Sequence, residues 1–126
     1  MQSCKQLEET SLNNKRIQIR VTEGKLVNGG LFSASYLLFR IKTEPVNYSI
    51  FRKDQDFYFL RKMLNKMFPY LIIPPLPIKK KKESEKTIKR REKYLTRFMQ
   101  AVCRSEEFKS YPFLIEFLKN DDIKEF

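Results

Sequence analysis

The sequence contains no histidine and no tryptophan, and it has only three glycines among 126 residues. Without histidine the chain has no Ser-His-Asp triad, no Cys-His pair, no histidine general base and no histidine metal ligand. It also lacks the G-x-x-x-x-G-K and G-x-G-x-x-G loops that hold nucleotide phosphates. We therefore expect a protein that is not an enzyme and that uses no cofactor or metal.

Cysteine and long apolar runs are scarce as well. Cys4 and Cys103 form no C-x-x-C pair, which argues against a zinc site or a redox motif, and we interpret both as reduced cytosolic thiols. The first residues lack the apolar stretch of a signal peptide, and no apolar run reaches the roughly 18 residues of a membrane span. These absences favour a cytoplasmic protein.

Basic side chains are abundant. The chain has 26 basic and 15 acidic residues, for a formal net charge of +11, and 41% of its residues are hydrophobic. That hydrophobic share is typical of a folded domain, and the length suits one domain with a modest core. The charge indicates an anionic partner, either nucleic acid or the phosphate groups of a membrane surface.

Hydrophobic periodicity changes from strand-like to helical along the chain. The sequence predicts three strands at 16–22, 35–42 and 48–53, a helix that Asp56 caps and Pro69 ends, an extended segment at Pro74–Pro77, and helices at 85–104 and 110–118. We place turns at Gly24 and at 28–30. Strands followed by helices describe one α+β domain, with a three-stranded antiparallel sheet packed against a helical subdomain and a proline-rich crossing loop. We expect a flexible leader at 1–14, the domain at 15–120 and a polar tail at 121–126.

Positive charge is concentrated between Lys79 and Arg97. This segment has ten basic and three acidic residues, which accounts for most of the net charge. Arg91 stands out because it lies three residues after Ile88 and four before Leu95, in the apolar stripe of the predicted helix. A guanidinium there needs an anion, which is either an internal carboxylate or a ligand phosphate.

The order of elements and four motifs resemble the phox-homology (PX) domain of sorting nexins and related trafficking proteins. The motifs are Arg52-Lys53-Asp54-Gln55-Asp56-Phe57 with Leu60, Pro74-Pro75-Leu76-Pro77-Ile78-Lys79, Arg91 with Leu95 and Phe98, and Ser110 with Leu114, Phe117 and Leu118. The resemblance covers about Arg16 to Asn120 and implies a PX-like fold. It also implies a phosphoinositide-binding module that is peripheral on endosomal or vesicle membranes and acts in endosomal sorting or vesicle trafficking.

The resemblance assigns lipid contacts residue by residue. Lys53 matches the basic residue that grips the 3-phosphate, Lys79 the lysine that meets the phosphate linking inositol to the lipid, and Arg91 the arginine that binds the ring hydroxyls. Asp54 stands where the family has the aromatic residue beneath the inositol ring, so the pocket is non-standard. Its negative charge beside the expected phosphate opposes binding. Arg52 compensates only if the strand twists or bulges.

The loop after the prolines also differs from the family, whose members often place bulky apolar residues there. Here Ile78 is followed by Lys80, Lys81 and Lys82, so we expect these residues to contact the membrane by shallow insertion and charge attraction.

Two other functions remain open at this point. A PX-fold protein-interaction module with weak, nonspecific binding to anionic lipid is the alternative, because Pro74–Pro77 has the P-x-x-P spacing of ligands for protein partners. The positive charge of the basic helix and the lysine run is sufficient for nucleic-acid binding. No zinc finger, RNA-recognition aromatic pair or recognition-helix pattern accompanies this charge, however. We therefore expect no nucleic-acid partner.

Overall fold

The computed structural model describes residues 17–31, 34–77 and 84–120. Its elements are β1 (Gln18–Val27), β2 (Tyr36–Glu44), β3 (Tyr48–Lys53), α2 (Asp54–Met67), α3 (Glu85–Arg104) and α4 (Pro112–Lys119). The expected strands, helices and α+β class are confirmed. The leader at 1–14 and the tail at 121–126 lie outside the described residues.

The sheet is antiparallel with the order β1-β2-β3. β1 is longer than the sequence predicts because a bulge between Thr22 and Lys25 shifts its register against β2 and lets the strand continue. Gly24 lies in this bulge and not in a turn as expected. A Cβ atom at Gly24 would lie 2.6 Å from the Phe39 ring and 2.7 Å from Ile88. Glycine is therefore required because β2 and α3 approach the bulge too closely for a side chain.

Helix α3 covers the free edge of β1. Three polar side chains spaced one helical turn apart reach the strand backbone. Glu92 Oε2 accepts from the Gly24 N–H over 2.8 Å, Thr96 Oγ1 accepts from the Val21 N–H over 3.0 Å, and Gln100 Nε2 donates to the Ile19 carbonyl over 3.3 Å. These bonds satisfy backbone groups that an edge strand would otherwise offer to another chain.

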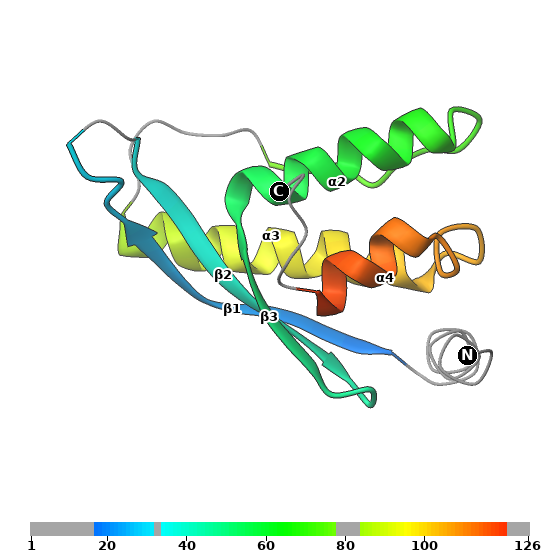
Figure 1. The fold of residues 1–126 in the computed structure, drawn as a ribbon, viewed down its shortest axis with the longest axis horizontal. Helices are drawn as coiled ribbons and strands as arrows, with labels where there is room; N and C mark the ends of the chain where they lie inside the picture. Colours follow the sequence, from blue (N-terminus) through cyan, green and yellow to red (C-terminus); the bar gives the residue numbers. More distant parts are fainter. Residues whose placement is uncertain (1–16, 32–33, 78–83, 121–126) are drawn as a thin grey trace.

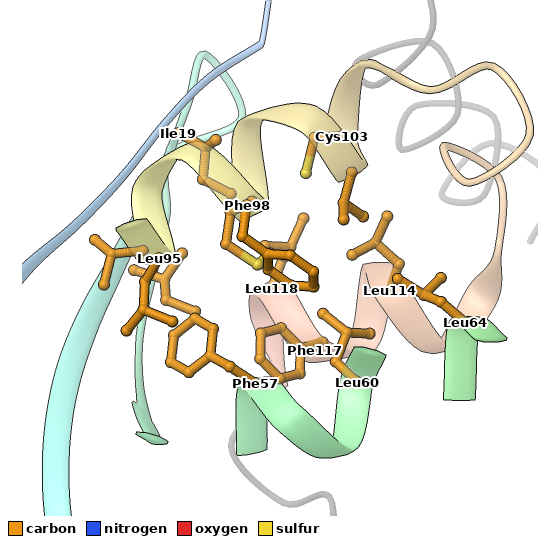
Figure 2. Close-up of a cluster of buried hydrophobic side chains, with 14 of the residues drawn as sticks. Ile19, Phe57, Leu60, Leu64, Leu95, Phe98, Cys103, Leu114, Phe117 and Leu118 are labelled. Carbon is orange, nitrogen blue, oxygen red and sulfur yellow. The ribbon is translucent and has the colours of Figure 1, made fainter. Parts of the chain in front are cut away.

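The core lies where the three helices meet the sheet (Figure 2). Side chains from all three helices converge with Ile19 of β1. They are Phe57, Leu60 and Leu64 of α2, Leu95, Phe98 and Cys103 of α3, and Leu114, Phe117 and Leu118 of α4. Burial of each large apolar side chain contributes about 1.5–3 kcal/mol. Each of these three helices thus contributes buried apolar side chains to the same cluster.

Helix α2 begins at Asp54, directly after β3. Asp56 is the third helical residue, and its Oδ2 accepts from the backbone N–H of Lys53 over 2.8 Å. The expected capping role of Asp56 is therefore exerted from within the first turn and not from the residue before the helix. Burial raises the pKa of Asp56 above its ordinary value, although this hydrogen bond acts in the opposite direction.

Helices α2 and α3 run in the same direction (Figure 1). Pro74–Pro77 runs back along α2, because Pro74 binds Arg61 and Pro77 binds Tyr58, three residues earlier in the helix. Helix α4 runs back toward the sheet and contacts β3. Within the described ranges, no helix is both long and apolar enough to cross a membrane.

Candidate functional site

The proline-rich segment is held against α2 by side chains that bind its carbonyl oxygens. Arg61 donates from Nε to the Pro74 carbonyl over 2.8 Å and from Nη2 to the Ile73 carbonyl over 3.3 Å. The hydroxyl of Tyr58 donates to the Pro77 carbonyl at the far end of the segment. The end of the segment is thus fixed directly before residues 78–83.

Arg91 lies at this same place. Its side chain is buried, with 6% of its surface exposed, and Nη1 donates to the hydroxyl of Tyr58 over 3.1 Å. Arg91, Tyr58 and Pro77 therefore form a chain of hydrogen bonds that connects α3, α2 and the end of the proline-rich segment. A guanidinium held in this way has a fixed plane, which suits recognition of oxygen acceptors.

Lys53 lies at the junction of β3 and α2. Its Nζ is 4.6 Å from the centre of the Tyr36 ring, a cation–π contact. Lys53 and Tyr36 line a hollow of about 420 Å³ together with Gln55 and residues of the connection between β1 and β2. The ammonium group therefore lies beside that connection, and the guanidinium of Arg91 lies beside Tyr58.

Arg52 is buried and its guanidinium binds carbonyls at the end of α4, so its expected contribution to lipid binding stays a prediction. Its side chain is only 5% exposed. Nε donates to the Phe117 carbonyl over 3.1 Å, and Nη2 donates to the carbonyls of Glu116 and Asn120. The Phe117 carbonyl is in the last turn of α4 and Asn120 caps the helix, whereas the Glu116 carbonyl also accepts from the Asn120 N–H over 2.9 Å. The strand does not bulge at Arg52, so its guanidinium serves α4.

Asp54 is the first residue of α2 and is partly exposed. A carboxylate at a helix N-terminus interacts favourably with the helix dipole. Asp54 therefore has a local structural benefit, in addition to the negative charge that it places next to Lys53.

The other expected contacts are outside the described residues. Ile78 and the lysines at 79–82 follow directly after Pro77, whose carbonyl is bound by Tyr58. Their expected roles as lipid and membrane contacts remain predictions.

Two aromatic residues near these groups were missed by the sequence analysis. Tyr58 lies four residues after Asp54, so helical spacing alone places both on one face of α2. Tyr36 is found only with the strand register, because Lys53 pairs with Leu38 of β2, two residues from Tyr36. The spacing of Tyr58 was available in the sequence, whereas the neighbourhood of Tyr36 was not.

The chain is similar to a known protein family, to a curated protein and to a solved structure. A family model described as the PX domain matches residues 42–121. Autophagy-related protein 20 of Candida albicans is 38% identical over 73 aligned residues, which cover 52% of this chain and 10% of that protein. The chain thus spans about a tenth of that relative.

The X-ray structure of a designed CISK-PX domain superposes with a TM-score of 0.67 at 22% identity. The match covers 79% of this chain and 96% of that chain, and at this identity it shows the fold. The family model spans more than half of the sequence. The chain therefore belongs to the PX domain family.

Proposed function

We propose that this PX domain is a phosphoinositide-binding module that docks peripherally on the cytoplasmic face of endosomal or vesicle membranes and acts in sorting or vesicle trafficking. The observation that carries the proposal is the buried guanidinium of Arg91, which lies at the end of the proline-rich segment and is oriented by Tyr58. A guanidinium presents several donors in one plane, which suits the phosphate and hydroxyl oxygens of an inositol headgroup. Similarity to an autophagy-related protein supports a trafficking role.

In this proposal the headgroup contacts three basic residues. Arg91 binds ring hydroxyls, Lys53 at the start of α2 binds the 3-phosphate, and Lys79 binds the phosphate that links inositol to the lipid. Lysine meets a phosphate as a point charge and lacks the bidentate fork of arginine. With Asp54 beside Lys53, we expect weaker preference for a 3-phosphate than an arginine-aromatic pair would give.

The segment after Pro77 provides a second, less specific attraction. Lys80, Lys81 and Lys82 approach the anionic leaflet, and each lysine near such a surface contributes roughly 1 kcal/mol. Ile78 inserts shallowly among the headgroups. Salt screens such attraction between charges, so we expect this contribution to fall with rising salt.

Asp54 favours one alternative, in which the domain binds anionic lipid weakly and without headgroup preference and serves mainly as a protein-interaction module. The two functions differ in what a vesicle assay detects. A headgroup pocket discriminates between lipids of equal charge, whereas a lysine surface responds only to charge density.

Liposome co-sedimentation at physiological salt distinguishes the headgroup-binding module from the nonspecific, protein-interaction module. Vesicles carrying each phosphoinositide are compared with phosphatidylserine vesicles of matched total charge. We expect preferential sedimentation with one phosphoinositide, and at least a tenfold loss of affinity in Arg91→Met, equivalent to about 1.4 kcal/mol. Methionine keeps the apolar stripe of α3 filled, so the variant tests the guanidinium and not the packing.

Arg104→Met is the matched control, because Arg104 is an exposed arginine at the other end of α3. It should bind vesicles like the unmodified chain. Equal binding to all charge-matched vesicles, or an Arg91→Met variant that is folded and retains the lipid preference, would contradict the proposed pocket.

A further inference from the structure

A second hollow lies between the proline-rich segment and α3. Pro74–Pro77 form one wall, and Tyr94, Arg97, Phe98 and Ala101 of α3 form the other. We call this hollow the proline groove. Its volume is about 480 Å³, within the range of roughly 300–1,000 Å³ that is typical of binding pockets.

The proline wall is apolar and preformed. Prolines have no backbone N–H to donate. The carbonyls of Pro74 and Pro77 already accept from Arg61 and Tyr58 of α2. What remains toward α3 is therefore the apolar surface of the proline rings and of Leu76.

The α3 wall is a face of the helix that is partly buried and partly exposed. One face of α3 enters the core through Leu95, and a second binds β1 through Thr96. Tyr94, Arg97, Phe98 and Ala101 follow the i, i+3, i+4, i+7 spacing of a third face. Phe98 is buried beneath the groove, whereas Tyr94 is 41% exposed and Ala101 is exposed. The small side chain of Ala101 leaves room for an incoming apolar group.

Two exposed arginines lie at the rim of the groove. The guanidinium carbon of Arg97 is 5.8 Å from the centre of the Tyr94 ring, and Arg90 lies one turn before Tyr94 on the same face. Both arginines are exposed. An apolar floor with arginines at its rim complements an acidic segment that carries bulky apolar side chains.

We propose that the proline groove binds an acidic peptide segment of a partner protein, which inserts an aromatic or aliphatic side chain between the prolines and Ala101 and pairs its carboxylates with Arg97 and Arg90. In this arrangement the prolines are part of the receptor. They are not a P-x-x-P ligand, because α2 already binds the carbonyls at both ends of the motif.

The position of the groove is compatible with simultaneous membrane docking. At 1.5 Å per residue, Tyr94 to Ala101 lie about 14–24 Å along α3 from Glu85, the end of the helix that follows the lysine segment. Arg90 and Arg97 are exposed, whereas Arg91 is buried beside Tyr58. The peptide and the proposed headgroup therefore contact different faces of α3, and this proposal is independent of the proposed lipid specificity.

The test is a selection of random 12-residue peptides, displayed on phage, for binding to the full 126-residue chain. The enriched peptides are then synthesised and their affinities are measured. We expect enriched peptides to combine Asp or Glu with Phe, Leu, Ile or Trp. Ala101→Glu fills the groove and places a negative charge beside the acidic peptide. It should weaken peptide binding at least tenfold, or about 1.4 kcal/mol. Arg97→Glu should do the same.

Matched variants control for charge and for folding. Ala34→Glu makes the same change at an exposed alanine outside the groove, and Lys89→Glu reverses a charge elsewhere on α3. Both should bind the peptides within about twofold of the unmodified chain, a difference below 0.5 kcal/mol. Circular dichroism shows that each variant is folded.

Other results would overturn the proposal. They include a selection without an enriched pattern, enriched peptides without acidic residues, and equal weakening in the groove and control variants. Dimers that form at high concentration and are abolished by Ala101→Glu would instead assign the groove to a second copy of the chain. Capture by a P-x-x-P-binding domain would show that the prolines act as a ligand.

Discussion

The Tyr58 hydroxyl accepts a hydrogen bond from Nη1 of Arg91 over 3.1 Å and donates one to the carbonyl of Pro77. The single proton of the hydroxyl goes to the carbonyl, so its oxygen is left to accept from the guanidinium. This relationship couples the orientation of the proposed headgroup arginine to the position at which the lysine segment begins. One side chain, Tyr58, thus contacts both the arginine that we propose to bind the headgroup and the residue before the segment that we propose to contact the membrane.

Tyr58→Phe should lower the free energy of unfolding by about 1–3 kcal/mol, because partly buried donor and acceptor groups lose their partner. Urea unfolding followed by circular dichroism measures the loss. Tyr70→Phe is the control, since Tyr70 is 76% exposed, and it should be neutral. Equal stabilities of Tyr58→Phe and the unmodified chain would show that the hydrogen-bond chain does not hold the segment.

Arg52→Lys should destabilise the fold by about 2 kcal/mol or more, because one ammonium cannot reproduce the fork that reaches several α4 carbonyls. Thermal unfolding measures this effect. Lipid preference should be unchanged at temperatures where the variant is folded, since Arg52 faces α4. A selective loss of phosphoinositide binding in a folded Arg52→Lys protein would show that Arg52 contributes to lipid binding.

Asp54→Tyr should strengthen recognition of a 3-phosphate, because it removes a negative charge and supplies an aromatic surface beside Lys53. The expected gain is about tenfold, or about 1.4 kcal/mol. The helix should lose about 0.3–1 kcal/mol because its N-terminal carboxylate is gone. Asp54→Asn separates the two causes, since it removes the charge without adding a ring. Unchanged vesicle affinity in both variants would mean that Asp54 does not face the headgroup.

Cys103 makes the free energy of unfolding depend on pH in the alkaline range. Burial raises the pKa of its thiol to about 12, whereas an unfolded cysteine has a pKa of about 8.5. Above pH 9 the unfolded chain gains thiolate while the folded chain keeps the neutral thiol. The stability contributed by this group is therefore complete below the unfolded pKa and is lost as pH rises toward the folded pKa.

The Cys103→Ala variant isolates this effect, because its other titrating groups are the same. The stability advantage of the unmodified chain over Cys103→Ala should shrink between about pH 9 and 11, with a slope of up to about 1.4 kcal/mol per pH unit. Guanidinium unfolding at a series of pH values measures it. A constant difference would indicate that the thiol of Cys103 ionises equally in both states.

Local patterns in the sequence determined most of the fold and part of the site. The expected helix at 85–104 matches α3, and the third strand matches β3, because helical and strand periodicities depend on residues close in the chain. The placement of Arg91 within an apolar stripe was also visible from spacing alone. Together with the proline motif, these local signals were sufficient to indicate the family.

Only the tertiary structure decided the partners of the charged residues. Arg52 and Lys53 are neighbours in sequence, yet one binds carbonyls near residue 117 and the other lies over Tyr36. Gly24 is required because Phe39 and Ile88 converge on it from different elements. The proline groove likewise exists because Pro74–Pro77 pack beside α3. Such contacts depend on how distant segments pack together, which the periodicity of each segment does not specify.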